Sequence, residues 1–392
     1  MYRIERAAIG SDIINDVRLW DSLAGDCPFR QSSWLRPWWT HFGDNRGLYV
    51  LLAKDESGIV CGILPLHCEK NHRGVLKFIG QGSACSDGLS ILCAASSAET
   101  IGREMGHWLA DHANSSEDRW SYLDLDGIIS GDRAMIGLSR GLSEGGVWID
   151  IQSRMHTWFK ETTGTLEDHL AALGRSRRRT ARRLLKQLEQ SPELSCELVS
   201  CESDLASSLD LMIDLHQRRW NSVGQPGSYA EPTFREFIHA AALAFFRRDR
   251  LRLCSLKLHD QIIASSLQMV ADDQSLAIYS TGVDLSHAEI EPGNLLNMLT
   301  MQHAYANSLP GIDYLRGDEP YKAQLQATPR RIARMLATPP TPRGRIQHTA
   351  WRSAFEVTQW IRQRRGRDPI AVLPNLEWLP NMHTQNELMG SE

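Results

Sequence analysis

The region 279–322 contains the residue types that could carry out a group transfer. A turn-rich loop ending at Gly293 leads into a helical pattern over 295–307. A loop that opens a helix presents unpaired backbone N–H groups and the positive end of the helix dipole, and phosphate binds at such places. We therefore expect the backbone of Gly293, Asn294 and Leu295 to bind a phosphate-bearing donor.

A second loop, directly after a predicted strand, supplies an acid, a base and a tyrosine. Tyr321 opens a short helix and could protonate a leaving group, while Asp318 or Glu319 could deprotonate an acceptor. Two cations of the same loop, Arg316 and Lys322, could bind phosphate, and Lys322 could instead lower the pKa of the tyrosine. This loop is therefore a candidate catalytic segment.

Each of these features also has a purely structural interpretation. Pro292 in the first turn is typical of an ordinary helix start, where glutamate is also favourable. Tyr321 could be half-buried beside a Lys322 that extends its ammonium to solvent. Arg316 and Asp318 could form a structural ion pair.

A third set of candidates begins on a helix predicted over 204–220. His216 and Trp220 are four residues apart on one helical face, where His216 could act as a base and Trp220 could contact substrate. A structural histidine is the alternative. Asp284, at a strand end, is either an Asx turn or an acceptor contact. Asp87, in a glycine-rich loop, could face the cleft from the first half of the chain.

The elements that must position these residues fall into two halves. Over 165–340 the predicted order is helix, helix, hairpin, strand, helix, strand, turn-helix and strand, and its first helix covers 166–190. Over 1–160 strands also alternate with helices. This order predicts an α/β fold with a mixed sheet, in two tandem domains of which the second is the clearer. Residues 341–392 are predicted as a linker, a short amphipathic helix and a tail.

Four motifs of the second half occur in a consistent order. They are His216-x-x-Arg219-Trp220, Tyr279-x-x-Gly282-x-Asp284, Pro292-Gly293-x-Leu295-Leu296 and Asp313-x-x-Arg316-Gly317-Asp318-Glu319-x-Tyr321-Lys322. With the order of elements, they resemble the cellulose-biosynthesis-associated (CelD-like) acetyltransferase family of bacteria. That family has a GNAT acyltransferase fold and is related to the Fem aminoacyl transferases.

The resemblance implies transfer of an acetyl or related acyl group from acetyl-CoA or another acyl-CoA. An amine or hydroxyl would attack the thioester, on a sugar or another precursor of the cell envelope or of a polysaccharide such as cellulose. A splayed strand pair would admit the pantetheine, the loop over 287–294 would bind the pyrophosphate, and Tyr321 would protonate the leaving sulfur. No metal is implied.

The loop departs from the glycine-rich loop that is common in GNAT enzymes. Glu289 and Glu291 are acidic, and only Gly293 is glycine. Two carboxylates repel a pyrophosphate unless they point away from it or contact the acceptor. Two rival hypotheses therefore remain: a Fem-like transferase with an aminoacyl-tRNA donor, and a catalytically inactive GNAT scaffold for polysaccharide synthesis.

A strongly basic segment covers 175–186. Its cations are Arg175, Arg177, Arg178, Arg179, Arg182, Arg183 and Lys186. A solvated helix face, a contact to tRNA and attraction to an anionic membrane surface all remain open. A second basic region surrounds the tail helix, where Trp351, Phe355 and Ile361 could lie at a membrane interface or pack on the transferase domain.

The composition indicates an ordinary globular protein. The 392 residues carry a formal net charge of −4, so the chain as a whole is no polycation. The start of the chain lacks the pattern of a signal peptide, and no apolar run is long enough to span a bilayer. The eight cysteines form no Cys-x-x-Cys pair, which favours reduced thiols over a disulfide framework or a zinc site. We expect a cytoplasmic protein, at most peripheral to the inner face of the membrane.

Overall fold

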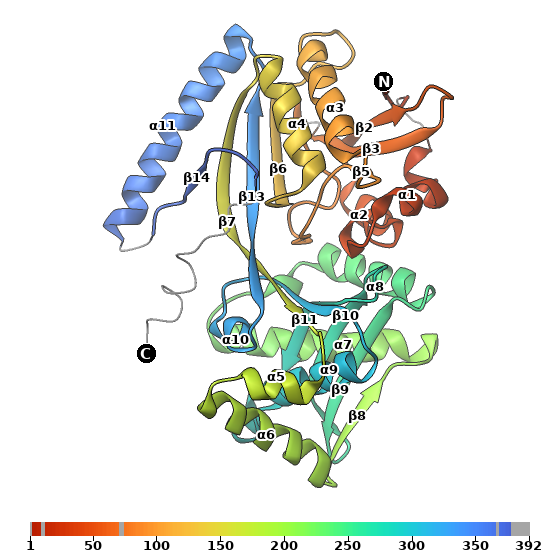
Figure 1. The fold of residues 1–392 in the computed structure, drawn as a ribbon, viewed down its shortest axis with the longest axis vertical. Coiled ribbons are helices and arrows are strands. Elements are labelled where there is room, and N and C mark those ends of the chain that lie inside the picture. The colour runs from red at the N-terminus through yellow and green to blue at the C-terminus, as the bar shows by residue number, and fades with distance from the viewer. Residues whose placement is uncertain (1, 9–11, 70–73, 366–367, 378–392) are drawn as a thin grey trace. The chain divides into compact units, whose positions relative to one another are not determined.

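The chain divides into two compact units in the computed structural model (Figure 1). The structure describes residues 2–8, 12–69, 74–365 and 368–377. Unit 1 comprises residues 1–156 and 330–392, and unit 2 comprises residues 157–329. The described part of the segment predicted over 341–392 is therefore grouped with unit 1, because the chain returns there after residue 329. The end of the predicted tail, over 378–392, lies outside the described residues.

Unit 1 is built on a mixed sheet in the order β1–β2–β3–β4–β6–β13–β7, with β5 beside β3 and β14 beside β7. Its strands are β1 (Arg3–Arg6), β2 (Arg46–Lys54), β3 (Val60–Glu69), β4 (Val75–Phe78), β5 (Leu92–Cys93), β6 (Tyr122–Ile129), β7 (Trp148–Glu161), β13 (Thr328–Thr338) and β14 (Val372–Leu373). Its α-helices are α1 (Val17–Ala24), α2 (Ser32–Phe42), α3 (Ala98–His112), α4 (Arg133–Glu144) and α11 (Pro342–Arg364).

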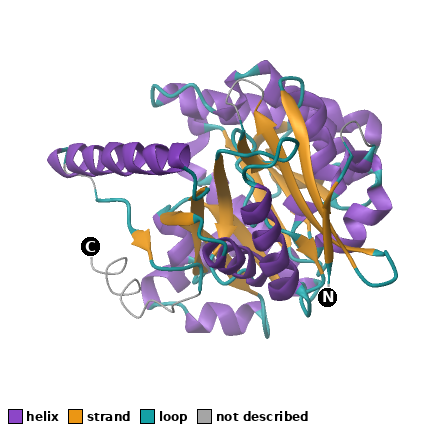
Figure 2. Cartoon of the chain, turned by 90° about the horizontal axis from the view of Figure 1, so that it is seen from above, coloured by secondary structure: helices purple, strands orange, loops and turns teal. Residues whose placement is uncertain are grey.

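Unit 2 continues from the end of β7 in the order β7–β12–β11–β10–β9–β8. Its own strands are β8 (Leu194–Leu198), β9 (Leu251–Leu258), β10 (Gln261–Val270), β11 (Leu276–Val283) and β12 (Gly311–Arg316). Its α-helices are α5 (Leu166–Ala172), α6 (Arg175–Gln190), α7 (Glu202–Ser222), α8 (Pro232–Phe246), α9 (Pro292–Ala306) and α10 (Pro320–Gln324). Both units contain helices and strands of a mixed sheet (Figure 2), so the predicted mixed α/β fold class is confirmed.

Helices α7 and α9 cover opposite faces of the unit 2 sheet at β11. A Cβ built at Gly282 would lie 2.4 Å from the carbonyl oxygen of Met212 on α7, while one built at Gly293 would contact Val283 at 3.4 Å. Gly282 and Val283 are consecutive in the strand, and consecutive strand residues point to opposite faces. The glycine of the Tyr279-x-x-Gly282 motif is therefore required by the close approach of α7.

The parallel strands β11 and β12 separate soon after they begin. They pair only at Leu276 with Ile312 and at Ala277 with Asp313. Beyond these pairs β12 shifts its register against β7, and Leu315 adopts a φ of 55°, which is unusual for a branched side chain. The later half of β11 therefore keeps a backbone edge that β12 does not occupy.

Three sequence predictions differ from the structure in their details. The helix predicted over 166–190 is two helices, because Leu173 is extended and Gly174 begins a new helix. The N-terminal segment, for which the sequence over 1–40 predicts helix and loop, contains strand β1, which pairs with β2. The short tail helix is the long α11, whose N-cap is Thr341, a residue of the predicted linker.

We predict that Gly282→Ala lowers the free energy of unfolding by about 1–3 kcal/mol, because the added methyl group overlaps the backbone of α7. Denaturant unfolding measures this. Gly293→Ala is the matched control, since its methyl group meets only Val283 at an ordinary contact distance. Equal stability of the two variants would contradict the close packing of α7 on β11.

Candidate functional site

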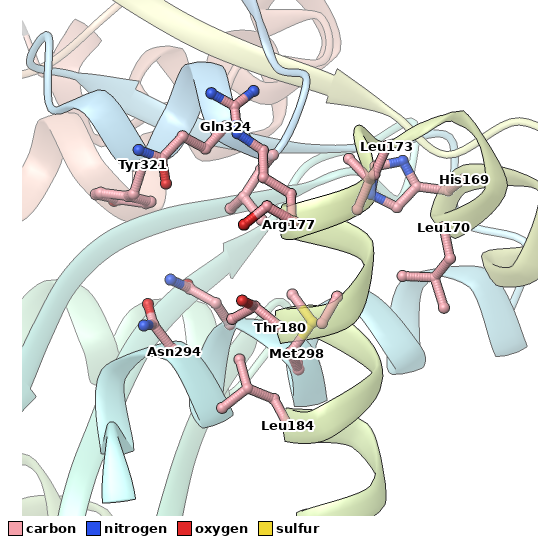
Figure 3. Close-up of a pocket in the computed structure, with 14 residues that line it drawn as sticks. His169, Leu170, Leu173, Arg177, Thr180, Leu184, Asn294, Met298, Tyr321 and Gln324 are labelled. Carbon is pink, nitrogen blue, oxygen red and sulfur yellow. The ribbon is translucent and has the colours of Figure 1, made fainter. Parts of the chain in front are cut away.

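Unit 2 contains a cavity of about 350 Å³ between α6, α9 and α10 (Figure 3). Its lining is mixed, with hydroxyl, amide and cationic groups beside leucine and methionine. The lining residues are His169, Leu170, Leu173, Ser176, Arg177, Thr180, Ala181, Leu184, Asn294, Asn297, Met298, Tyr321, Gln324 and Leu325. A concave, partly apolar site with a few convergent polar groups is the usual form of a small-molecule site.

The cavity brings together two predicted site residues from separate loops, Asn294 and Tyr321. Asn294 stands in the first turn of α9, where the amides of Gly293 and Asn294 have no protein acceptor among the described residues. The amide of Leu295 instead donates to the carbonyl of Glu291 at 3.0 Å. The predicted phosphate-binding backbone is therefore reduced to two amides, and Leu295 is removed from it.

The two acidic residues of the loop before α9, Glu289 and Glu291, do not both present unpaired negative charge at the start of the helix. Glu291 forms an ion pair with Arg183 of α6 and accepts a hydrogen bond from Asn294 Nδ2 at 2.9 Å. Glu289 is largely exposed, and its carboxylate lies 3.9 Å from His287. Helix α6 thus neutralises Glu291 and places the cation of Arg177 on the cavity wall.

Tyr321 lies in the first turn of α10 and is partly exposed toward the cavity (Figure 3). Its ring meets the ring of Tyr314 edge-on, with centroids 6.1 Å apart. Burial and the carboxylate of Glu319 raise the pKa of Tyr321 to about 12, and Arg219 opposes that rise. The phenol is therefore protonated at neutral pH and can donate a hydrogen bond.

Lys322 and Glu319, the other charged residues beside Tyr321, bond to groups of the turn itself. Lys322 is buried, and its Nζ donates to the carbonyls of Leu315, Arg316 and Gly317 at 3.1, 2.8 and 3.1 Å. It also lies 2.9 Å from the Glu319 carboxylate. We therefore no longer assign Lys322 to phosphate binding or Glu319 to proton transfer.

Asp318 and Arg316 lie on the same turn and do not line the cavity. Asp318 accepts a hydrogen bond from the indole of Trp158 at 3.1 Å. Asp313, at the base of the turn, accepts from Thr157 Oγ1 and from the amide of Leu315, both at 2.9 Å. These carboxylates stabilise the turn that carries Tyr321.

The structure does not bring His216, Trp220 or Asp284 into the cavity. His216 Nε2 accepts a hydrogen bond from the indole of Trp220 at 2.9 Å, and burial lowers its pKa. Asp284 accepts from the amide and hydroxyl of Ser286 at 3.0 and 2.7 Å, which is the predicted Asx turn. Asp87 belongs to unit 1 and is buried there.

Sequence reasoning missed most of the cavity wall. Arg177 was noted as part of a basic helix, but its charge pattern did not show that it faces a cavity. His169 and Gln324 carried no pattern of their own in the sequence. None of the described residues form a group of three or more His, Cys, Asp or Glu side chains that could hold a metal ion.

The comparison with protein families defines the class of this site. Residues 175–323 match the family model of the acetyltransferase (GNAT) domain, and they lie entirely within unit 2. The protein is therefore an acyltransferase, as the sequence predicted. The more specific resemblance, to the cellulose-associated family, stays a prediction. No curated protein matches the chain.

Solved structures with the same fold have low sequence identity. FemX matches with a TM-score of 0.57 at 10% identity, over 84% of this chain and 96% of FemX. A conserved protein of unknown function from Bacteroides thetaiotaomicron VPI-5482 matches with a TM-score of 0.51 at 14% identity, over 86% and 100%. A tandem GNAT protein from the clavulanic acid biosynthesis pathway gives 0.47 at 13%, over 87% and 100%. At these identities the likeness to FemX and the Bacteroides protein concerns the fold alone.

We predict that Lys322→Met lowers the free energy of unfolding by about 2 kcal/mol or more, because three carbonyls lose a charged donor. Chemical denaturation measures the change. Lys186→Met is the control, since Lys186 is exposed on α6 and such surface changes stay within about 0.5 kcal/mol. A Lys322 variant as stable as the control would return this lysine to the list of ligand-binding candidates.

Proposed function

We propose that the protein transfers an acetyl or related acyl group from a CoA thioester to an amine or hydroxyl. The observation that carries this proposal is the meeting of Tyr321, the open start of α9 and Arg177 at one cavity. The acceptor would be a sugar or another cell-envelope or polysaccharide precursor, as the family resemblance implies.

The phosphates of the donor would bind between α9 and α6. The amides of Gly293 and Asn294 point from a helix start, where the helix dipole favours negative charge. Arg177 adds a full positive charge from the facing helix, and the hydroxyls of Ser176 and Thr180 also line the wall. Helix α6 would thus supply the anion binding that the glycine-poor loop lacks.

The pantetheine arm would bind along the free edge of β11. Pairing of β11 with β12 stops after Ala277, so β12 does not occupy that side of the later part of the strand. The two amide groups of pantetheine can bond to such an edge as an added strand does.

In the transfer itself, the acceptor nitrogen or oxygen forms a bond to the thioester carbon as the C–S bond breaks. The acceptor loses one proton, and the released thiolate takes up one proton to leave as free CoA. Tyr321 would donate a hydrogen bond to the sulfur as negative charge develops there. Since a thiol has a pKa of about 8.5, complete transfer from a phenol of pKa about 12 would be uphill by roughly 5 kcal/mol. Charge stabilisation is therefore the main role of Tyr321.

A Fem-like donor, aminoacyl-tRNA, is the second candidate and is favoured by the charge of α6. Arg178, Arg182 and Arg183 have protein partners, in Leu173, Glu167 and Glu291. Arg175 and Arg179 are exposed and could neutralise RNA phosphates. The inactive scaffold loses its main argument, because the acidic loop is neutralised by Arg183.

Peripheral attachment to an anionic membrane remains part of the proposal and is supported by α11 in unit 1. Its inner face is held by the 2.8 Å contact of His348 with Asp150. Ile346, Val357 and Trp360 are 73, 57 and 53% exposed on this arginine-rich helix. Apolar side chains among arginines are typical of helices that bind at a lipid surface. Among the described residues, no helix is long and apolar enough to cross a bilayer.

We predict that Tyr321→Phe lowers turnover at least tenfold with little loss of thermal stability, because only the hydrogen-bond donor is removed. The assay measures release of CoA thiol from acetyl-CoA with a panel of amino-sugar and hydroxyl acceptors. Tyr314→Phe is the matched control, since its hydroxyl is buried outside the cavity. Unchanged turnover of the Tyr321 variant would remove Tyr321 from the mechanism.

We predict that acetyl-CoA raises the melting temperature and that Arg177→Gln removes most of this shift. Arg179→Gln, on the same helix but outside the cavity wall, should leave the shift intact. If the donor is aminoacyl-tRNA instead, acetyl-CoA gives no shift, and both variants weaken a salt-sensitive binding of tRNA. Thermal shift and tRNA titration therefore separate a local phosphate site from a broad polyanion surface.

A further inference from the structure

His169 is a buried polar residue that the proposed transfer does not yet use. It is 5% exposed and lines the cavity, and neither Nδ1 nor Nε2 has a hydrogen-bond partner among the residues that the structure describes. Buried side-chain nitrogens are nearly always paired, because an unpaired one loses its bonds to water without replacement. An imidazole with both nitrogens unpaired on a cavity wall therefore indicates a ligand with hydrogen-bonding groups.

The surroundings of His169 keep the ring uncharged. Burial and the nearby Lys160 lower the pKa of His169 to about 4. The ring stacks on Tyr305 with centroids 6.0 Å apart and 23° between the planes. A neutral imidazole offers one N–H donor and one acceptor nitrogen, on opposite sides of the ring.

His169 and Tyr321 occupy different ends of the cavity wall. In Figure 3, Tyr321 and Gln324 lie on one side of α6, His169, Leu170 and Leu173 lie on the other, and Arg177 lies between them. In the proposed donor complex, the thioester lies at Tyr321 and the phosphates lie at Arg177. The His169 end is then the place for the part of the donor beyond its phosphates.

We propose that the His169 end of the cavity binds the adenosine of the donor, with His169 as a specificity residue. This inference rests on the proposed function. Adenosine is the group beyond the phosphates in CoA. In an aminoacyl-tRNA the terminal adenosine carries the acyl ester itself and precedes the phosphates, so this assignment applies to a CoA donor.

The chemistry of the wall fits a nucleoside better than the other parts of a donor. One imidazole nitrogen can bond to a ring nitrogen or to the exocyclic amine of adenine, and the other can bond to a ribose hydroxyl. Leu170 and Leu173 provide apolar surface for the flat faces of the base. An alkyl chain would leave both nitrogens unpaired, and a phosphate would need a cation that neutral His169 does not provide.

This contact would lie outside the acetyltransferase domain that the family comparison identifies. His169 precedes residue 175, where the match begins. Helix α5 is joined to α6 by the ion pair of Glu167 with Arg182 and by the bond of Arg178 to the Leu173 carbonyl at 2.9 Å. The two helices together would hold a nucleoside against the GNAT core.

The test compares His169→Leu with the wild-type chain by calorimetric titration of CoA and of 4′-phosphopantetheine, which lacks adenosine. We expect the variant to bind CoA at least tenfold more weakly, which is about 1.4 kcal/mol, and to bind 4′-phosphopantetheine as the wild type does. Its melting temperature should equal or exceed that of the wild type, because leucine brings no unpaired nitrogens into the wall. His67→Leu is the control, since His67 is buried in unit 1 with an unpaired Nδ1.

An RNA hairpin ending in CCA distinguishes the two sources of adenosine. A wild type that binds this hairpin and not CoA would overturn the assignment, because the terminal adenosine of tRNA lies next to the acyl ester and not beyond the phosphates. Unchanged affinity for the adenosine-bearing ligand, or an equal loss for 4′-phosphopantetheine, would overturn the role of His169 while the proposed function stands. A wild type that binds none of the three probes would overturn both. His169→Phe replaces the leucine variant if that variant does not fold.

Discussion

The ammonium of Lys322 holds the segment on which the site depends. It gathers the carbonyls of Leu315, Arg316 and Gly317 around one buried point, which requires the chain to turn sharply at the end of β12. The left-handed conformation of Leu315 is the local cost of that turn. β12 no longer pairs with β11 beyond Asp313, just before this turn, and α10 follows the turn and carries Tyr321 to the cavity. The buried ammonium of Lys322 thus stabilises the turn that follows β12 and precedes Tyr321.

A second charge arrangement explains how an acidic loop can face an anionic donor. In a glycine-rich loop, backbone amides alone supply the binding groups and no side chain competes. Here Glu291 caps the approach to α9 in a left-handed conformation, and its carboxylate is bound by Arg183. Helix α6, which carries Arg183, also carries Arg177 on the cavity wall. The carboxylate of Glu291 therefore helps to hold α6 in place, and Arg177 of α6 places a positive charge at the cavity.

The sequence was sufficient to predict elements and loops, but not which side chains would form their hydrogen bonds and ion pairs within the fold and so be unavailable to a ligand. The order of strands and helices in unit 2, the open start of α9 and the position of Tyr321 followed from hydrophobic pattern, turn residues and helix-start rules. Lys322 was predicted as a ligand because its charge could bind phosphate, and only the three-dimensional turn shows three carbonyls around it. His216 and Trp220 were correctly placed on one helical face, but a helical period does not tell which face of the sheet a helix covers. His169 could not be predicted at all, because its importance comes from the absence of partners, which is a property of packing.

These features share one physical theme, which is that the site retains groups a purely stable fold would avoid. A leucine and a glutamate adopt left-handed backbone conformations, and a buried imidazole lacks hydrogen bonds. Such groups cost stability and persist where function requires them. His169 lines the cavity, Glu291 directly precedes the cavity helix α9, and Leu315 lies on the strand before α10. Helix α5, which precedes the acetyltransferase match, thus lines the cavity together with α6. Donor recognition, as we propose it, depends on α5 as well as on the GNAT core.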